Sequence, residues 1–170
     1  ESVKRCNAVI SQATKLGDAL ANGAEVIAQA KFIKGFWMYE AIRIYGPAIP
    51  YVTVEDYENS TDPQVTNVDE NGNYVYIWDK VAQDLIDAAA GLPETWPDGQ
   101  SARATKWQAK AVLAKLYMNW SSPYDGSAGY GTGNKWTEVA GILDDIIANG
   151  KDAKGTKYQL ADTYDALWNY

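Results

Sequence analysis

Apolar residues recur at three- and four-residue spacings along most of this chain, which is the pattern of amphipathic α-helices. The pattern predicts five helices, at about residues 3–20, 24–45, 75–90, 105–120 and 136–149. Glycine, proline or asparagine stands at most of the breaks between them, where these residues commonly end a helix. The chain is therefore expected to be all-α.

The second predicted helix, at 24–45, is apolar over more than one stripe. Val26, Ile33 and Trp37 mark one face, whereas Phe32 and Tyr39 widen the apolar surface beyond it. A helix that is apolar over so much of its surface is buried between several neighbours. We therefore expect at least two partners for this helix and a core position for Trp37. The short joint at residues 22–23 predicts an antiparallel hairpin with the first helix.

The fourth predicted helix carries small residues where a neighbouring helix could approach closely. Ala109, Leu113 and Trp120 fall on one face, and Ala111 and Ala114 thin the flank beside it. Larger side chains at these alanines would overfill the contact. Thr105, at the start of this helix, is expected to be its N-cap or a first-turn residue.

Antiparallel helix pairs in this order are typical of a tetratricopeptide-like array. The regular 34-residue period of such arrays is not kept, because long loops separate the predicted pairs at about 46–74 and 121–134. We expect residues 1–170 to form a single helical region, a degenerate array with long loop insertions. Loops of this length commonly carry functional residues.

Composition restricts the chemistry that is available. The chain has no histidine and a single cysteine, Cys6, which excludes Ser-His and Cys-His nucleophile pairs and the common zinc sites within this sequence. A net charge of −7 without a basic cluster argues against nucleic-acid binding. No run of eighteen apolar residues could span a membrane. We expect no catalytic residues, no cofactor and no metal site, and we interpret Cys6 as a helix core residue.

Two acidic features are weak candidates for a site. Residues 69–73 begin like a calcium-binding loop, but Tyr74 and Lys80 stand where an EF-hand needs glycine and a bidentate glutamate. The alternative is a polar loop in which Asn71 or Asn73 caps the third helix. The acidic pairs at 84/87 and 144/145 are interpreted as solvated helix faces, because a glycosidase needs two carboxylates opposed across a cleft.

The aromatic residues are mostly the types that carry a polar group, with seven Trp and twelve Tyr against two Phe. Such rings suit helix packing, and they equally suit stacking on sugar rings. Trp96 lies in a proline-flanked loop that is expected to be too short to bury it well, and Trp120 and Tyr124 border a glycine-rich loop. These three residues are the candidate ligand-binding residues. The alternative interpretation is that Trp96 and Trp120 close the ends of the helix array.

Four segments carry a resemblance to a known family. Residues 103–117 read RATKWQAKAVLAKLY, which is similar to the signature helix of the SusD/RagB family of surface glycan-binding lipoproteins. The other three are residues 30–50, which look like the family's long helix running into its Tyr-Gly-x-x-Pro turn, 76–93, which end in Leu-Pro, and 136–164. Gly35 departs from the alanine that is more usual in the family, and Pro47 with Ala48 departs from its usual turn.

The resemblance implies an all-helical scaffold with tetratricopeptide-like pairs. It also implies non-catalytic binding of an oligosaccharide or other nutrient and its delivery to a SusC-like TonB-dependent transporter. The protein would lie on the external face of the outer membrane, held by a lipid anchor outside this sequence. In the family the glycan site is built largely outside the helix pairs, and these 170 residues are expected to be an excerpt of a longer protein. The rival interpretation is a helical protein–protein scaffold that contacts no glycan.

Overall fold

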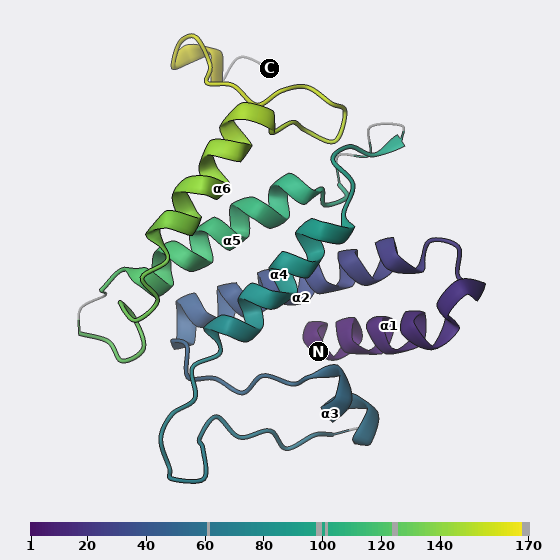
Figure 1. Ribbon diagram of the computed structural model, residues 1–170, viewed down its shortest axis with the longest axis vertical. Coiled ribbons are helices and arrows are strands. Elements are labelled where there is room, and N and C mark those ends of the chain that lie inside the picture. The colour runs from purple at the N-terminus through teal and green to yellow at the C-terminus, as the bar shows by residue number, and fades with distance from the viewer. Residues whose placement is uncertain (61, 98–99, 101, 124–125, 168–170) are drawn as a thin grey trace.

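The protein is all-helical, as predicted (Figure 1). The computed structural model describes residues 1–60, 62–97, 100, 102–123 and 126–167. Its α-helices are α1 (Ser2–Leu16), α2 (Gly23–Tyr45), α3 (Val54–Asn59), α4 (Trp78–Gly91), α5 (Lys106–Ser121) and α6 (Trp136–Asn149). Two short 3-10 helices lie at Gly17–Ala19, directly after α1, and at Asp165–Leu167, after α6. Within the described ranges the β-structure consists of two isolated bridges.

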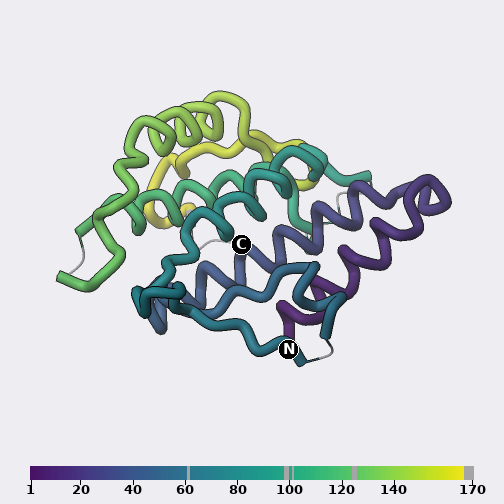
Figure 2. Tube along the Cα trace, turned by 60° about the horizontal axis from the view of Figure 1, so that its bottom comes forward, coloured from purple at the N-terminus to yellow at the C-terminus, as the bar shows by residue number. Residues whose placement is uncertain are grey.

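The long helices pack in chain order. α1 packs on α2, α2 on α4, α4 on α5, and α5 on α6, while the short α3 packs on α1. Figures 1 and 2 both place the α1–α2 hairpin at one end of the molecule and α6 at the other. The inner helices therefore have neighbours on two sides, and the terminal helices have a face that these five helices leave open.

α2 and α4 approach each other closely at two glycines. A Cβ atom at Gly35 would come within 2.9 Å of the Leu85 side chain, and one at Gly91 would come within 2.7 Å of Ala28 Cβ. Glycine lets the two backbones approach where any side chain would have to displace a neighbour. The departure at Gly35 thus lies at a tight contact between buried helices.

The predicted small-residue contact on α5 is confirmed in part. Ala109 and Ala114 are buried against the core, whereas Ala111 is only half-buried. Thr105 forms a capping box with Gln108, in which the Thr105 backbone N–H donates to the Gln108 carboxamide oxygen. The capping role predicted for Thr105 is therefore confirmed.

The loop that resembles a calcium site closes on itself. Asp69 Oδ1 accepts the backbone N–H groups of Asn71 and Asn73 at 2.9 and 2.8 Å, and Gly72 adopts a φ of +80°. These hydrogen bonds lower the pKa of the Asp69 carboxyl, the largest cause being those from Asn73. The expectation that Asn71 or Asn73 caps the third helix is wrong, because α4 starts after Ile77.

A second loop repeats the same construction near the C-terminal end. Asp152 Oδ1 accepts the backbone N–H groups of Lys154 and Thr156 at 2.9 and 2.8 Å, and Gly155 has a φ of +93°. An isolated bridge closes each loop. In both cases the aspartate satisfies backbone donors of a tight turn, which is a structural role.

Candidate functional site

Trp96, the first candidate residue, is buried, with 4% of its surface exposed. Its indole N–H donates to Ala104 O at 2.8 Å, and its backbone N–H donates to Ala153 O at 3.0 Å. The guanidinium of Arg103 lies 3.4 Å from the ring centroid. The expectation that this loop is too short to bury Trp96 is wrong, because the 150–158 segment folds back over it.

Trp120, the second candidate, stacks on a buried tryptophan. Its ring centroid lies 6.2 Å from that of Trp78 with an interplanar angle of 7°. Trp78 in turn contacts the edge of Tyr130 and donates its indole N–H to Gly129 O at 2.9 Å. Tyr117 lies tilted against Trp120 on the same helix. Trp120 thus belongs to an aromatic cluster that joins α4, α5 and the glycine-rich loop.

The glycine-rich loop covers part of the Trp120 ring. A Cβ at Gly133 would lie 2.5 Å from Trp120 Cγ, so the backbone of this glycine lies directly against the indole. The Trp120 N–H donates to Thr132 Oγ1 at 3.0 Å, and the Lys135 ammonium lies 5.5 Å from the ring centroid. Trp120 is half-buried as a result. A sugar could reach only the part of the ring that Trp78 and this loop leave open.

Tyr124, the third candidate, lies outside the described residues. Sugar binding at Trp96, Trp120 and Tyr124 therefore stays a prediction. The structure places Trp120 in the aromatic cluster, packed against the buried core, whereas Trp96 lies in the loop that follows α4 and belongs to a separate hydrophobic cluster that includes Ala153. The three candidates do not form a single exposed platform in the part of the chain that is described.

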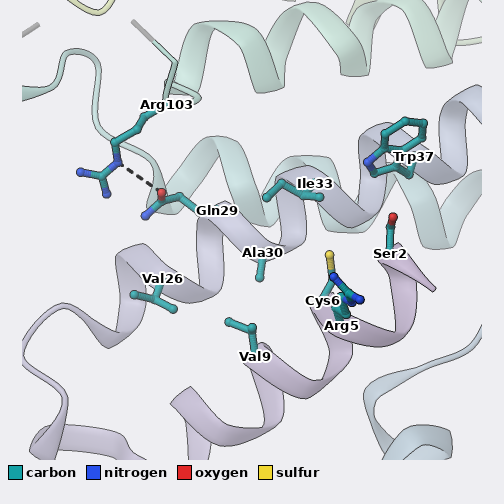
Figure 3. A pocket seen from close by; sticks show the side chains of 10 residues that line it. All are labelled: Ser2, Arg5, Cys6, Val9, Val26, Gln29, Ala30, Ile33, Trp37 and Arg103. Atoms are coloured by element: carbon teal, nitrogen blue, oxygen red, sulfur yellow. Dashed lines mark hydrogen bonds between the residues drawn. The ribbon is translucent and has the colours of Figure 1, made fainter. Parts of the chain in front are cut away.

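A largely apolar hollow lies elsewhere, between α1 and α2. A pocket of about 540 Å³ is lined by apolar side chains of both helices and is bordered by Arg5 and Arg103 (Figure 3). Trp37 lies at one end of it, and the hydrogen-bonded pair Arg103 and Gln29 lies at the other. Trp37 is 51% exposed, so the expectation that it is a core residue is wrong.

Sequence reasoning also missed a buried charged cluster between α2 and α4. The Lys34 ammonium lies 3.7 Å from Asp84 Oδ2 and 4.3 Å from the centroid of the Tyr51 ring. The Tyr51 hydroxyl donates to the same Asp84 oxygen. All three side chains are buried, so the interpretation of Asp84 as solvated is wrong. Asp87 and Asp145, by contrast, are half-buried and pair with Lys31 and Lys110.

Burial sets the protonation preferences in this cluster. It raises the pKa of Asp84, against the opposing effect of Lys34, and it lowers the pKa of Lys34. Burial likewise raises the pKa of the Tyr51 hydroxyl and of the nearby Cys6 thiol. Cys6 is buried in the helix core, as predicted. Because Asp84 accepts a hydrogen bond from Tyr51 and faces Lys34, we interpret the cluster as a satisfied structural network.

Sequence signals for this network were present. Asp84 stands at the helical spacing of Val81 and Ala88 and so lies on the inward face of its helix. Lys34 precedes Gly35, a residue type that lets another helix come close. When two facing helices each carry a charged residue on the apolar stripe, the two charges are expected to pair in the core. Considering each helix by itself could not show this pairing.

Half-buried ion pairs occur near the start of α5. Glu94 accepts hydrogen bonds from Lys106 and Lys151, which lower its pKa to about 2. Across the described ranges no three His, Cys, Asp or Glu side chains gather as metal ligands. No helix in those ranges is both long and apolar enough to cross a bilayer.

Comparison with known proteins identifies the family. The profile of a SusD-like family, described as "Starch-binding associating with outer membrane", matches residues 2–118. The chain belongs to the SusD-like family. It is also 27% identical over 165 residues to a SusD-like protein of Bacteroides ovatus. That alignment covers 96% of this chain but only 27% of the relative, so the chain spans about a quarter of the relative's length.

Solved structures of the SusD superfamily share the fold. A SusD superfamily protein of Parabacteroides distasonis aligns with a TM-score of 0.66 at 22% identity, over 97% of this chain and 32% of that one. A SusD homologue of Bacteroides thetaiotaomicron aligns at 0.59 and 21% identity, over 85% and 25%. A third structure, described as a complex with a xylogluco-oligosaccharide, aligns at 0.67 and 24%, over 98% and 30%. These similarities support the helical-array interpretation.

Proposed function

We propose that the full-length protein captures an oligosaccharide at the cell surface without cleaving it. The observation that carries this proposal is membership of a family described as starch-binding and associated with the outer membrane. A solved structure of the same fold is described as a complex with a xylogluco-oligosaccharide, which makes such an oligosaccharide one ligand class to test.

Delivery to a SusC-like TonB-dependent transporter is the second part of the proposal. The family resemblance supports this partner, as it supports a lipid anchor and a place on the external face of the outer membrane. An all-helical array with long loops offers the extended surface that a large protein partner requires. No nucleic-acid partner is expected, because the net charge is −7.

The ligand contacts that this chain could contribute lie at the aromatic cluster of α5. Trp120 is half-buried and borders the glycine-rich loop, and Tyr124 follows shortly after α5 ends. We retain Trp120 and Tyr124 as candidate sugar contacts. Trp96 would need Arg103 to leave its ring before a sugar could stack there.

The test uses the full-length protein and candidate oligosaccharides, including fragments of xyloglucan and starch. Calorimetry should show saturable binding, and no new reducing ends should form during incubation. Replacing Trp120 or Tyr124 with alanine should weaken binding by about 1–3 kcal/mol, by analogy with rings that stack on bases. Trp136→Ala, at an exposed tryptophan of α6, is the matched control and should leave affinity unchanged.

Two results would contradict the proposal. Time-dependent production of reducing ends would indicate a glycosidase, and no binding to any glycan would favour the scaffold interpretation. Gentle extraction of outer membranes should also recover a TonB-dependent barrel with the protein. If cross-linking and co-purification both failed, delivery to a transporter would be wrong even where glycan binding held.

A further inference from the structure

An apolar trough follows the outer side of the α1–α2 hairpin. The pocket of Figure 3, which includes Val9, Val26 and Trp37, continues into a second hollow that shares Val9 and Val26 and extends to Leu16. We call this continuous surface the α1–α2 trough. It follows α1, whose 15 residues span about 22 Å at 1.5 Å per residue.

The trough exposes more apolar surface than a terminal helix pair normally does. Val9, Leu16, Ile33 and Trp37 are each between 43% and 53% exposed. End repeats of helical arrays need a polar outer face to remain soluble. A contiguous apolar surface of this kind marks a site where something else packs.

The chemistry of the rim argues against a sugar in the trough. Apart from Trp37 at one end, the floor is formed mainly by aliphatic side chains and Cys6, which offer few hydrogen bonds to hydroxyl groups. The charged groups at the rim already have partners within the protein. Arg103 binds Glu25 and Gln29, and Arg5 binds Glu1. Such a surface suits the apolar side of another helix.

The relatives indicate where that helix comes from. The chain spans 27% of the Bacteroides ovatus relative and 25% to 32% of three aligned solved structures, so each of these proteins has at least twice as much further chain. We propose that a helix of the same polypeptide, from outside residues 1–170, packs its apolar side into the α1–α2 trough. This proposal rests on family membership and does not depend on glycan binding.

Thiol accessibility in the full-length protein tests the proposal. In a Cys6→Ala background without other reactive thiols, Val9→Cys places a small thiol on the trough, where the native side chain is 43% exposed in these residues alone. Lys115→Cys, on the exposed side of α5, is the matched control. The maleimide labelling rate of each folded variant is compared with its own rate in denaturant.

A helix in the trough should slow labelling at Val9→Cys by at least about tenfold relative to Lys115→Cys, because labelling then requires local opening. This protection should not change with protein concentration or with added glycan. If Val9→Cys does not fold, Trp37→Cys replaces it, because Trp37 lies at the other end of the pocket.

Each alternative occupant gives a different result. Equal labelling at the two positions would overturn the proposal, because the trough would then be open in the complete protein. Protection that grows with protein concentration would indicate a second copy instead. Protection that requires an oligosaccharide or the transporter would assign the trough to that partner and would also overturn the proposal. Loss of glycan binding alone would contradict only the proposed function.

Discussion

α2 carries a buried lysine on the side that faces α4 and an exposed tryptophan on the side that faces the trough, which is the opposite of what these residue types usually do. On the side that faces α4, Lys34 is 2% exposed and approaches Asp84. On the side that faces the trough, Trp37 is 51% exposed. A charged residue is therefore inside and a tryptophan outside, three positions apart on one helix. The contrast teaches that the inner side is complete, because its polar atoms are satisfied, whereas the outer side is ready for a further packing partner.

The largest expected effect comes from breaking the inner pair. Asp84→Ala leaves the Lys34 ammonium buried without its carboxylate, and a broken buried pair typically costs about 3–5 kcal/mol. Urea unfolding of the full-length protein measures this loss. The double variant Lys34→Met with Asp84→Leu should recover most of it, because no unpaired charge remains. A loss below about 1 kcal/mol in the single variant, as for an exposed pair, would show that water reaches the pair.

A smaller effect is expected at Gly35, where α2 and α4 are in close contact. Gly35→Ala would place its Cβ 2.9 Å from the buried Leu85 side chain, so overpacking should destabilise the protein by about 1–3 kcal/mol. Gly141→Ala is the control, because its Cβ on α6 would meet nothing within 4 Å. That variant should gain about 0.5–1 kcal/mol from helix propensity. Equal shifts in the two melting temperatures would contradict the tight α2–α4 contact.

The smallest effect is expected at Glu94, whose ion pairs are far more accessible to solvent than the Lys34–Asp84 pair. Its pKa is lowered to about 2 from an ordinary 4.5, so its stabilising contribution is complete above pH 4.5 and is lost as the pH falls towards 2. Glu94→Gln should therefore flatten the decline of stability across this window. Glu70→Gln, at an exposed loop position, is the control and should keep the slope. An unchanged slope in Glu94→Gln would remove the role assigned to Lys106 and Lys151.

The five long helices could be predicted because each carries a sustained apolar period. The short α3 could not, since its six residues are mostly polar and it is held by a Thr53–Asp56 capping box and by contacts with α1. The ends also shifted: the first helix stops at Leu16, and the third begins at Trp78. Element existence follows from periodicity, while boundaries depend on local caps.

The candidate site was less predictable because burial depends on distant segments. Loop length alone indicated an exposed Trp96, but Ala153, 57 positions away by residue number, covers it. Periodicity correctly marked the Trp37 face as apolar, yet it could not say that this face lies on the outer side of a terminal hairpin. The same limit applies to Asp84, whose partner is on another helix.

The chain-order packing of the long helices has a consequence for how the protein folds. Contacts between elements close in sequence are cheap to form, because little loop entropy is lost before they stabilise the chain. The α1–α2 hairpin can therefore form as soon as its residues leave the ribosome, and α4, α5 and α6 can dock on it one after another. The backbone hydrogen bond from Trp96 N–H to Ala153 O would form late in this order of folding, because it joins the loop after α4 to the segment after α6.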